Sequence, residues 1–184
     1  MTRLVLSLVF SLLYSTAAFA AASFQFAMPG IQAPKDANVQ GMRFVLLHGK
    51  NERVGGLDLG FAAFSESVTQ SGFTFNMGIS KVSGSSSGGS ITLVNVHEGA
   101  DSGLNGSFVN IIKSVDNGIN VGILNITEGT SNVDVGGLSM SKKSSTQLGF
   151  VNFTQEITNL QIGLLNFAGN GFFPVFPFFN YPKK

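Results

Sequence analysis

LQIGLLNF, residues 160–167, is the stretch from which the fold can be worked out. Side chains alternate between the two faces of a β-strand, so a half-buried strand carries its apolar residues on one face. Here Leu160, Ile162 and Leu164 fall on one face, whereas Leu165 and Phe167 fall on the other. This pattern predicts a chain that bends within the segment, so that residues of both nominal faces point inward.

Close variants of this segment recur upstream. When they are aligned on Gly163, the spacings between successive anchor positions are 18, 14, 15, 15, 14, 13 and 14 residues. The anchor is always small, as expected where the backbone bends or packs closely against a neighbour. The anchor residues are Gly60, Gly78, Thr92, Ser107, Gly122, Gly136, Gly149 and Gly163. A repeat of this length is typical of stacked coils, whose apolar residues flanking the anchor are expected to fill one continuous core.

Asparagine recurs three residues after the anchor. Because asparagine is a poor strand former, its repetition in one register needs a physical cause. In a parallel stack, equivalent residues lie about 4.8 Å apart, so each amide can donate to the carbonyl of the next. The sequence therefore predicts an asparagine ladder. This position holds Ala63, Lys81, Asn95, Asn110, Asn125, Ser139, Asn152 and Asn166.

These observations predict an all-β protein, a repeat β-solenoid of about eight coils of 13–18 residues. Twenty-three glycines and eighteen phenylalanines suit tightly turned extended structure, and no helical apolar stripe is present. The polar stretches 127–132, 141–145 and 154–158 are expected to be turns. The alternative is an antiparallel meander or an outer-membrane β-barrel, but the loops of such barrels alternate short and long, and antiparallel neighbours would break the asparagine register.

The N-terminal residues 1–20 have the organisation of a secretory signal peptide. Arg3 precedes an apolar run from Leu4 to Tyr14, and Ala18 and Ala20 form an A-x-A cleavage signal. The run is shorter than the roughly 20 residues that span a bilayer. We expect an N-terminal linker at 21–40, the β repeat domain at 41–168 and an aromatic, proline-containing C-terminal cap at 169–184.

Charge and composition narrow the possible partners. Lys and Arg number 11 and Asp and Glu 10, which gives no basic surplus for nucleic acid. The chain has no cysteine, which excludes disulfides and a lipid-anchored cysteine. No residue pattern indicates a cofactor.

One segment matches a catalytic motif. Gly84-Ser85-Ser86-Ser87-Gly88 fits G-x-S-x-G, which in hydrolases needs a preceding strand, a following helix and a histidine base. Only His97 follows and no helix is indicated, so the tract KVSGSSSGGS (81–90) is interpreted as a flexible loop that interrupts the repeat. His97, Glu98 and Asp101 could form a weak divalent cation site, but solvated turn residues are the favoured interpretation. We predict no catalytic, cofactor or metal residue.

The C-terminal segment GFFPVFPFFNYPKK (171–184) combines five phenylalanines and a tyrosine with three prolines. Proline excludes a regular helix or central strand here. The aromatic residues could fold over the last coil and close its open end. Alternatively, they could enter a membrane interface while Lys183 and Lys184 meet anionic headgroups. The cap is the favoured interpretation.

Successive segments of the form G-[LV]-x-[IL]-G-[LFI]-[LV]-N follow the opening GMRFVLLHGKNERVGGLDLGFA (41–62) and precede the closing GNGFFPVFPFFNY (169–181). In this order they resemble a family of uncharacterised exported bacterial proteins with G-L-x-I-G-L-x-N surface repeats. The resemblance implies location and architecture, and no enzymatic activity.

The sequence therefore favours a non-enzymatic, structural or interaction protein of the bacterial envelope. We expect it at the cell surface, in the outer membrane or in the periplasm of a Gram-negative bacterium. A protein or glycan partner is expected because solenoid faces often serve as extended binding surfaces. Outer-membrane association is the further possibility, and an integral outer-membrane barrel, perhaps a small pore, is the alternative function.

Overall fold

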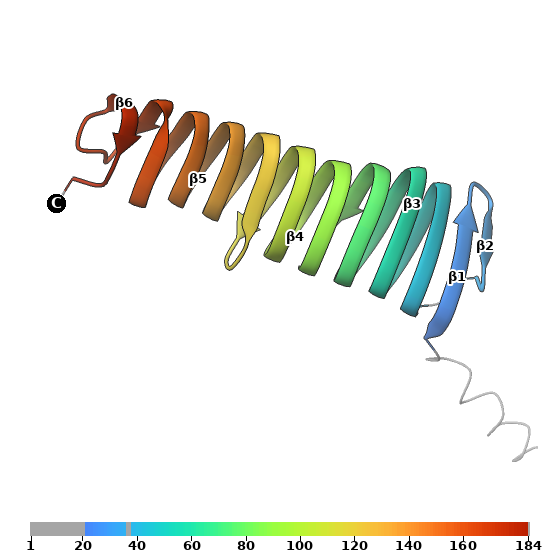
Figure 1. Ribbon diagram of the computed structural model, residues 1–184. Helices are drawn as coiled ribbons and strands as arrows, with labels where there is room; N and C mark the ends of the chain where they lie inside the picture. Colours follow the sequence, from blue (N-terminus) through green and yellow to red (C-terminus); the bar gives the residue numbers. More distant parts are fainter. Residues whose placement is uncertain (1–20, 36–37, 184) are drawn as a thin grey trace, which may run out of the picture.

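The computed structural model describes residues 21–35 and 38–183, and this part of the chain winds repeatedly around one axis (Figure 1). The expected signal peptide at 1–20 lies outside the described residues. Each of the three longest β segments runs through more than one coil. The segments are β1 (Ala22–Met28), β2 (Ile31–Ala33), β3 (Val39–Val82), β4 (Ser86–Val115), β5 (Ile119–Ala168) and β6 (Val175–Asn180).

Successive coils pair in parallel. In β3 and β4, Thr74 lies opposite Ser90, and in β4 and β5, Asn110 lies opposite Asn125. The predicted repeat β-solenoid is confirmed, with about seven turns. Parallel pairing between the coils excludes the antiparallel alternatives for the described residues.

Antiparallel segments close both ends of the stack. At the N-terminal end β1 pairs in parallel with β3, and β2 folds back antiparallel on β1, so the prediction of a linker at 21–40 is wrong. At the C-terminal end β6 pairs antiparallel with the last coil of β5. The backbone of β6 covers that end, whereas Phe178 and Phe179 remain 69% and 48% exposed. The strand is short and contains Pro177, two features that limit further pairing at a sheet edge.

The predicted register is wrong at its first repeats. Asn76, rather than Gly78, lies opposite Thr92, because a bulge between Asn76 and Ile79 shifts the pairing. The same shift places Ser80, rather than Lys81, opposite Asn95. Gly78 instead stacks on Ala63, where a Cβ atom would collide with the Ala63 backbone. Asn76 therefore replaces Gly78 in the anchor column.

The serine-glycine tract is more regular than predicted. Ser86 to Ser90 continue the solenoid in register with Gln70 to Thr74, and only Ser83 to Ser85 connect β3 with β4. The stacking of Gly88 on Gly72 accounts for the glycines. Both have φ near +117°, a left-handed conformation, and a Cβ atom on Gly88 would meet the Gly72 backbone.

The interior of the solenoid is polar, and the predicted apolar core is wrong. In the opening segment Gln161 and Asn166 are fully buried, whereas Ile162, Leu164 and Leu165 are 47%, 58% and 44% exposed. The anchor and the residue two before it point inward, so the apolar residues on either side of the anchor point outward. The chain does bend at Leu164 and Leu165, but the bend turns both side chains outward.

The polar stretches expected to be turns are also part of the continuous strand β5. Thr127, Ser141 and Thr154 point into the interior from these stretches, each nearly fully buried. Ile112, Val115 and Ile157 are among the few large apolar side chains inside. Hydrogen bonds between polar side chains of successive coils therefore take the place of most of an apolar core.

Candidate interaction surface

The asparagine ladder holds the corner of each coil in place. Asn95 Nδ2 donates to Asn110 Oδ1 at 3.1 Å, and Asn110 Nδ2 donates to Asn125 Oδ1 at 2.9 Å. Asn152 Nδ2 donates to Asn166 Oδ1 at 2.8 Å. All five side chains are fully buried. Ser139 occupies the position between Asn125 and Asn152, and it accepts from Asn125 at 3.4 Å.

Three of the ladder amides, those of Asn110, Asn125 and Asn152, also bind the backbone of the next coil. Asn110 donates to the carbonyl of Val121 at 3.2 Å, and Asn152 donates to that of Ile162 at 2.9 Å. Glycine at the anchor leaves room for these amides: a Cβ atom on Gly163 would lie 2.6 Å from Asn152 Nδ2. The anchor glycine and the asparagine three residues later therefore form one structural unit.

A second polar column runs two residues before the anchor, and the sequence analysis missed it. Asn105 donates to Asn120 at 3.1 Å, and Asn120 donates to Asp134 at 2.9 Å. From the other side, Gln161 donates to Gln147 at 2.8 Å and Gln147 to Asp134 at 3.4 Å. The donor direction therefore reverses at Asp134, where a carboxylate suits the column because it only accepts.

Burial raises the pKa of Asp134, while hydrogen bonds from Ser131, Asn120 and Gln147 oppose that rise. Desolvation disfavours the charged carboxylate because the low-dielectric interior solvates it less well than water.

Near the N-terminal end, the same column contains a buried ion pair. Arg43 and Asp58 are 1% and 3% exposed, and Arg43 Nη2 lies 2.6 Å from Asp58 Oδ2. Arg43 also donates to Asn51 Oδ1 at 2.8 Å and to Ser65 Oγ. The guanidinium thus has partners on all sides, as a buried cation requires.

The histidine and acidic cluster is also part of the interior. His97 and Asp101 are 2% and 1% exposed, and His97 Nδ1 contacts Asp101 Oδ2. The prediction that they are solvated turn residues is wrong, although Glu98 is exposed and pairs with Lys81 at 2.9 Å. Within the described residues no group of three or more His, Cys, Asp or Glu could hold a metal ion. Ser86 is buried in β4, and a strand rather than a helix follows it.

Outward side chains around the anchor form an apolar band along the whole stack, which we call the apolar edge. It comprises the positions one before and one, two and four after the anchor. In the coil of Asn76 the bulge adds one residue, so Ile79 and Lys81 take the last two positions. The first two rows are Leu59, Phe75, Ile91, Val121, Val135, Leu148 and Ile162, and Phe61, Met77, Leu93, Phe108, Ile123, Phe150 and Leu164. The other two are Ala62, Ile79, Val94, Val109, Leu124, Leu138, Val151 and Leu165, and Phe64, Val96, Ile111, Ile126, Met140, Phe153 and Phe167.

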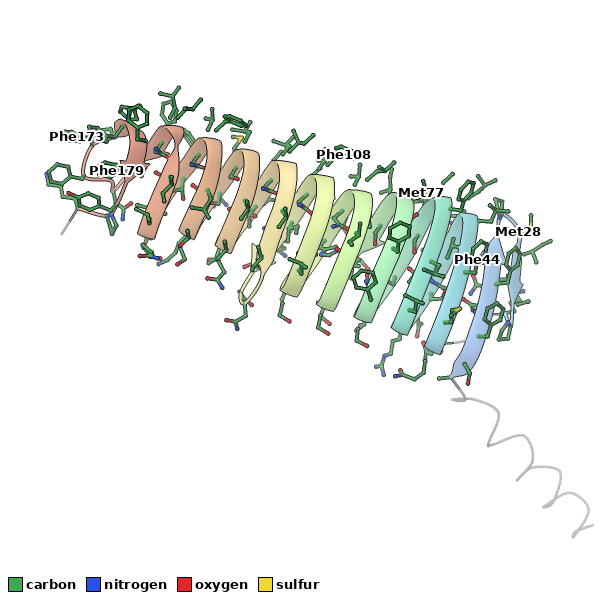
Figure 2. All side chains as sticks on the ribbon, in the orientation of Figure 1. Met28, Phe44, Met77, Phe108, Phe173 and Phe179 are labelled. Atoms are coloured by element: carbon green, nitrogen blue, oxygen red, sulfur yellow. The ribbon has the colours of Figure 1, made fainter. Side chains whose placement is uncertain are left out.

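Figure 2 shows these side chains along the upper edge of the solenoid, where Met77 and Phe108 are labelled. Phe108, Ile123 and Phe150 are 56%, 62% and 66% exposed. Lys81 is the one charged residue at the four positions that define the apolar edge. Most monomeric proteins expose no contiguous apolar patch beyond about 300–600 Å², so a band of this extent points to an interaction surface.

Two open grooves lie on the apolar edge. One, of about 430 Å³, is lined by residues that include Ile91, Phe108 and Ile123. The other, of about 510 Å³, is lined by Phe150, Leu164 and Phe178 among others. Phe178 belongs to β6, so the exposed aromatic cluster of the C-terminal segment continues the apolar edge beyond the last coil.

The opposite edge of the solenoid carries the charges. Its side chains end in oxygen and nitrogen along the lower side of Figure 2. Ion pairs link neighbouring coils there: Lys143 Nζ lies 2.7 Å from Glu156 Oε1, and both side chains are about half exposed. The solenoid is therefore apolar on one edge and charged on the opposite edge, and this division continues from coil to coil along the axis.

No helix in the described part of the chain could cross a membrane. No family model, curated protein or solved structure matches the chain. The resemblance to exported surface-repeat proteins accordingly stays a prediction.

Proposed function

We propose that the protein is a non-enzymatic, exported protein of the bacterial envelope whose contact surface is the apolar edge. The observation that carries this proposal is the exposure of large apolar side chains along the entire stack, such as Phe61, Phe108 and Phe150 at 55%, 56% and 66%. Burying a fully exposed large apolar side chain is favourable by about 1.5–3 kcal/mol, so a partner that covers these partly exposed side chains would recover roughly half of that free energy for each.

The polar columns support the proposal because they make the scaffold independent of the apolar edge. Hydrogen bonds between coils hold the solenoid together from inside, so apolar residues outside are free to serve a partner. Export is supported by the sequence of residues 1–20. The chain has no cysteine, so it is compatible with any redox compartment.

A photo-crosslinking experiment in cells tests the proposal. A diazirine amino acid replaces Ile123 on the apolar edge or, as the matched control, exposed Asn117 in the connection between β4 and β5, which projects from the lower side of the solenoid in Figure 1. We expect the protein in the envelope or medium fraction, with adducts from position 123 at least about fivefold above those from position 117. Retention in the cytoplasm would contradict export, and equal adducts would contradict the assignment of the contact surface.

A further inference from the structure

We infer that the apolar edge inserts into the acyl region of a phospholipid bilayer, with the solenoid axis lying along the membrane surface. This inference rests on the proposed function, in which the apolar edge is the contact surface, and names its partner. Three observations favour lipid over a second copy of the chain, another protein or a glycan: the convex shape of the apolar edge, its chemistry and the uneven size of its side chains.

The apolar edge is convex because two consecutive side chains point outward at each corner. Leu164 and Leu165 are 58% and 44% exposed on the two sides of the bend. The eight anchors span seven coil steps, or about 34 Å at about 4.8 Å a step, and the side before the bend is about 13 Å wide, giving about 450 Å².

A stable dimer interface buries about 800 Å² on each partner. A second copy pressed against one side of the bend covers about half of that and leaves the other side in water. A fluid acyl layer covers both sides of a convex edge at once.

The chemistry of the apolar edge suits lipid rather than a glycan. Apart from Lys81, its side chains carry no polar group with which to bind a sugar. Along the coils, backbone groups are paired between successive turns, as in Val109 to Ile112 against Leu124 to Thr127. A protein surface in contact with acyl chains must satisfy its backbone in this way, because lipid offers no hydrogen-bond partner.

The row nearest the bend varies widely in size, from Phe108 through Ile123 to Gly137 and Phe150. A rigid partner would have to match this profile, whereas acyl chains adapt to it. The charged edge lies on the far side, as in interfacial amphipathic helices. The chain has 11 Lys and Arg against 10 Asp and Glu, so it has no large basic surplus to attract anionic headgroups.

Vesicle flotation of the full chain tests this inference. The probes are phosphatidylcholine vesicles and vesicles in which one quarter of the lipid is phosphatidylglycerol, at low and high salt. The test variant combines Phe108→Glu with Phe150→Glu, and the matched control combines Asn117→Glu with Gln155→Glu, at two exposed positions outside the apolar edge. All share residues 1–20, so any contribution of that segment cancels. Circular dichroism verifies that each variant keeps its strand content.

We expect binding to phosphatidylcholine that changes less than about twofold with salt or with phosphatidylglycerol. The apolar-edge variant should bind at least about tenfold more weakly, and the control within about twofold of the unchanged chain. Equal loss in both variants, or no binding by the unchanged chain, would overturn the inference.

Sedimentation without lipid identifies the other occupants. A dimer that the apolar-edge variant dissociates would assign the surface to a second copy, which overturns the membrane inference but leaves the proposed function intact. If vesicle binding persists in the folded apolar-edge variant and crosslinking is equal at positions 117 and 123, both the membrane inference and the proposed contact surface are refuted.

Discussion

Replacing Asn152 with leucine measures what one rung of the ladder contributes. In the folded protein Asn152 Nδ2 donates to Asn166 Oδ1 at 2.8 Å and to the carbonyl of Ile162 at 2.9 Å. Leucine has a similar volume but no donor, so two acceptors in the interior lose a hydrogen bond. Each unpaired buried polar group costs about 1–3 kcal/mol. One acceptor is a backbone carbonyl only partly buried, and leucine also removes Asn152 Oδ1, a buried atom that has no hydrogen-bond partner among the described residues, so we expect a total loss of about 2–4 kcal/mol.

Urea unfolding followed by circular dichroism measures this loss. With a slope of about 2 kcal/mol per molar urea, the midpoint should fall by about 1–2 M. Gln155→Leu is the matched control: Gln155 is exposed three residues away, and its replacement should cost within about 0.5 kcal/mol. Hydrogen exchange should quicken around residues 149–167 more than around 90–110, because solenoid coils depend mainly on their neighbours. An unchanged or raised midpoint for Asn152→Leu would refute a stabilising ladder.

Two further substitutions test the anchor and the second column. Gly149→Ala should lower the free energy of unfolding by about 1–3 kcal/mol, because its Cβ atom would collide with the Gly136 carbonyl. Gly106→Ala is the control, because its Cβ atom would lie 3.5 Å from the Ser90 carbonyl, and its urea midpoint should hardly change. Burial raises the pKa of Asp134 above its ordinary 3.8, so its contribution to stability is full below that pH and is lost as pH rises through the folded pKa. Asparagine at position 134 cannot titrate, so the urea midpoint of Asp134→Asn minus that of the unchanged chain should increase between pH 4 and pH 8. If this difference stays constant with pH, the raised pKa of Asp134 is contradicted.

The repeat itself carries enough information to predict the solenoid. Glycine at Gly122, Gly149 and Gly163 with asparagine three residues later fixes the coil length, and the hydrogen bonds show why the two residues recur together. The prediction of register fails at Gly78, because nothing in the local sequence distinguishes a bulge from a regular step. A second glycine column at 15 or 16 residue spacing, which includes Gly72 and Gly88, would have corrected it.

The orientation of the side chains could not be predicted from the rule that apolar residues lie inside. That rule assigned Ile162 and Leu164 to the core and overlooked Gln161 between Leu160 and Ile162. The available signal was the polar row two residues before each anchor, which includes Asn120, Asp134, Gln147 and Gln161. Its polarity is nearly unbroken along the stack, whereas scattered surface residues would vary independently.

The polar interior and the apolar exterior follow from one physical requirement. A side chain inside a narrow coil meets mainly its equivalents in the coils before and after it, as Gln147 meets Asp134 and Gln161. Stacked amides form hydrogen bonds with one another at this spacing and so fix the register of the coils. Apolar side chains are interchangeable and fix the register less strictly. Association with lipid through the outside would leave these columns undisturbed, because their donors and acceptors face one another rather than solvent. An apolar core, by contrast, owes its stability to exclusion from water, and that driving force weakens wherever acyl chains replace water around the protein. A hydrogen-bonded interior therefore keeps the scaffold rigid on both sides of the water–lipid boundary at which the apolar edge is inferred to lie.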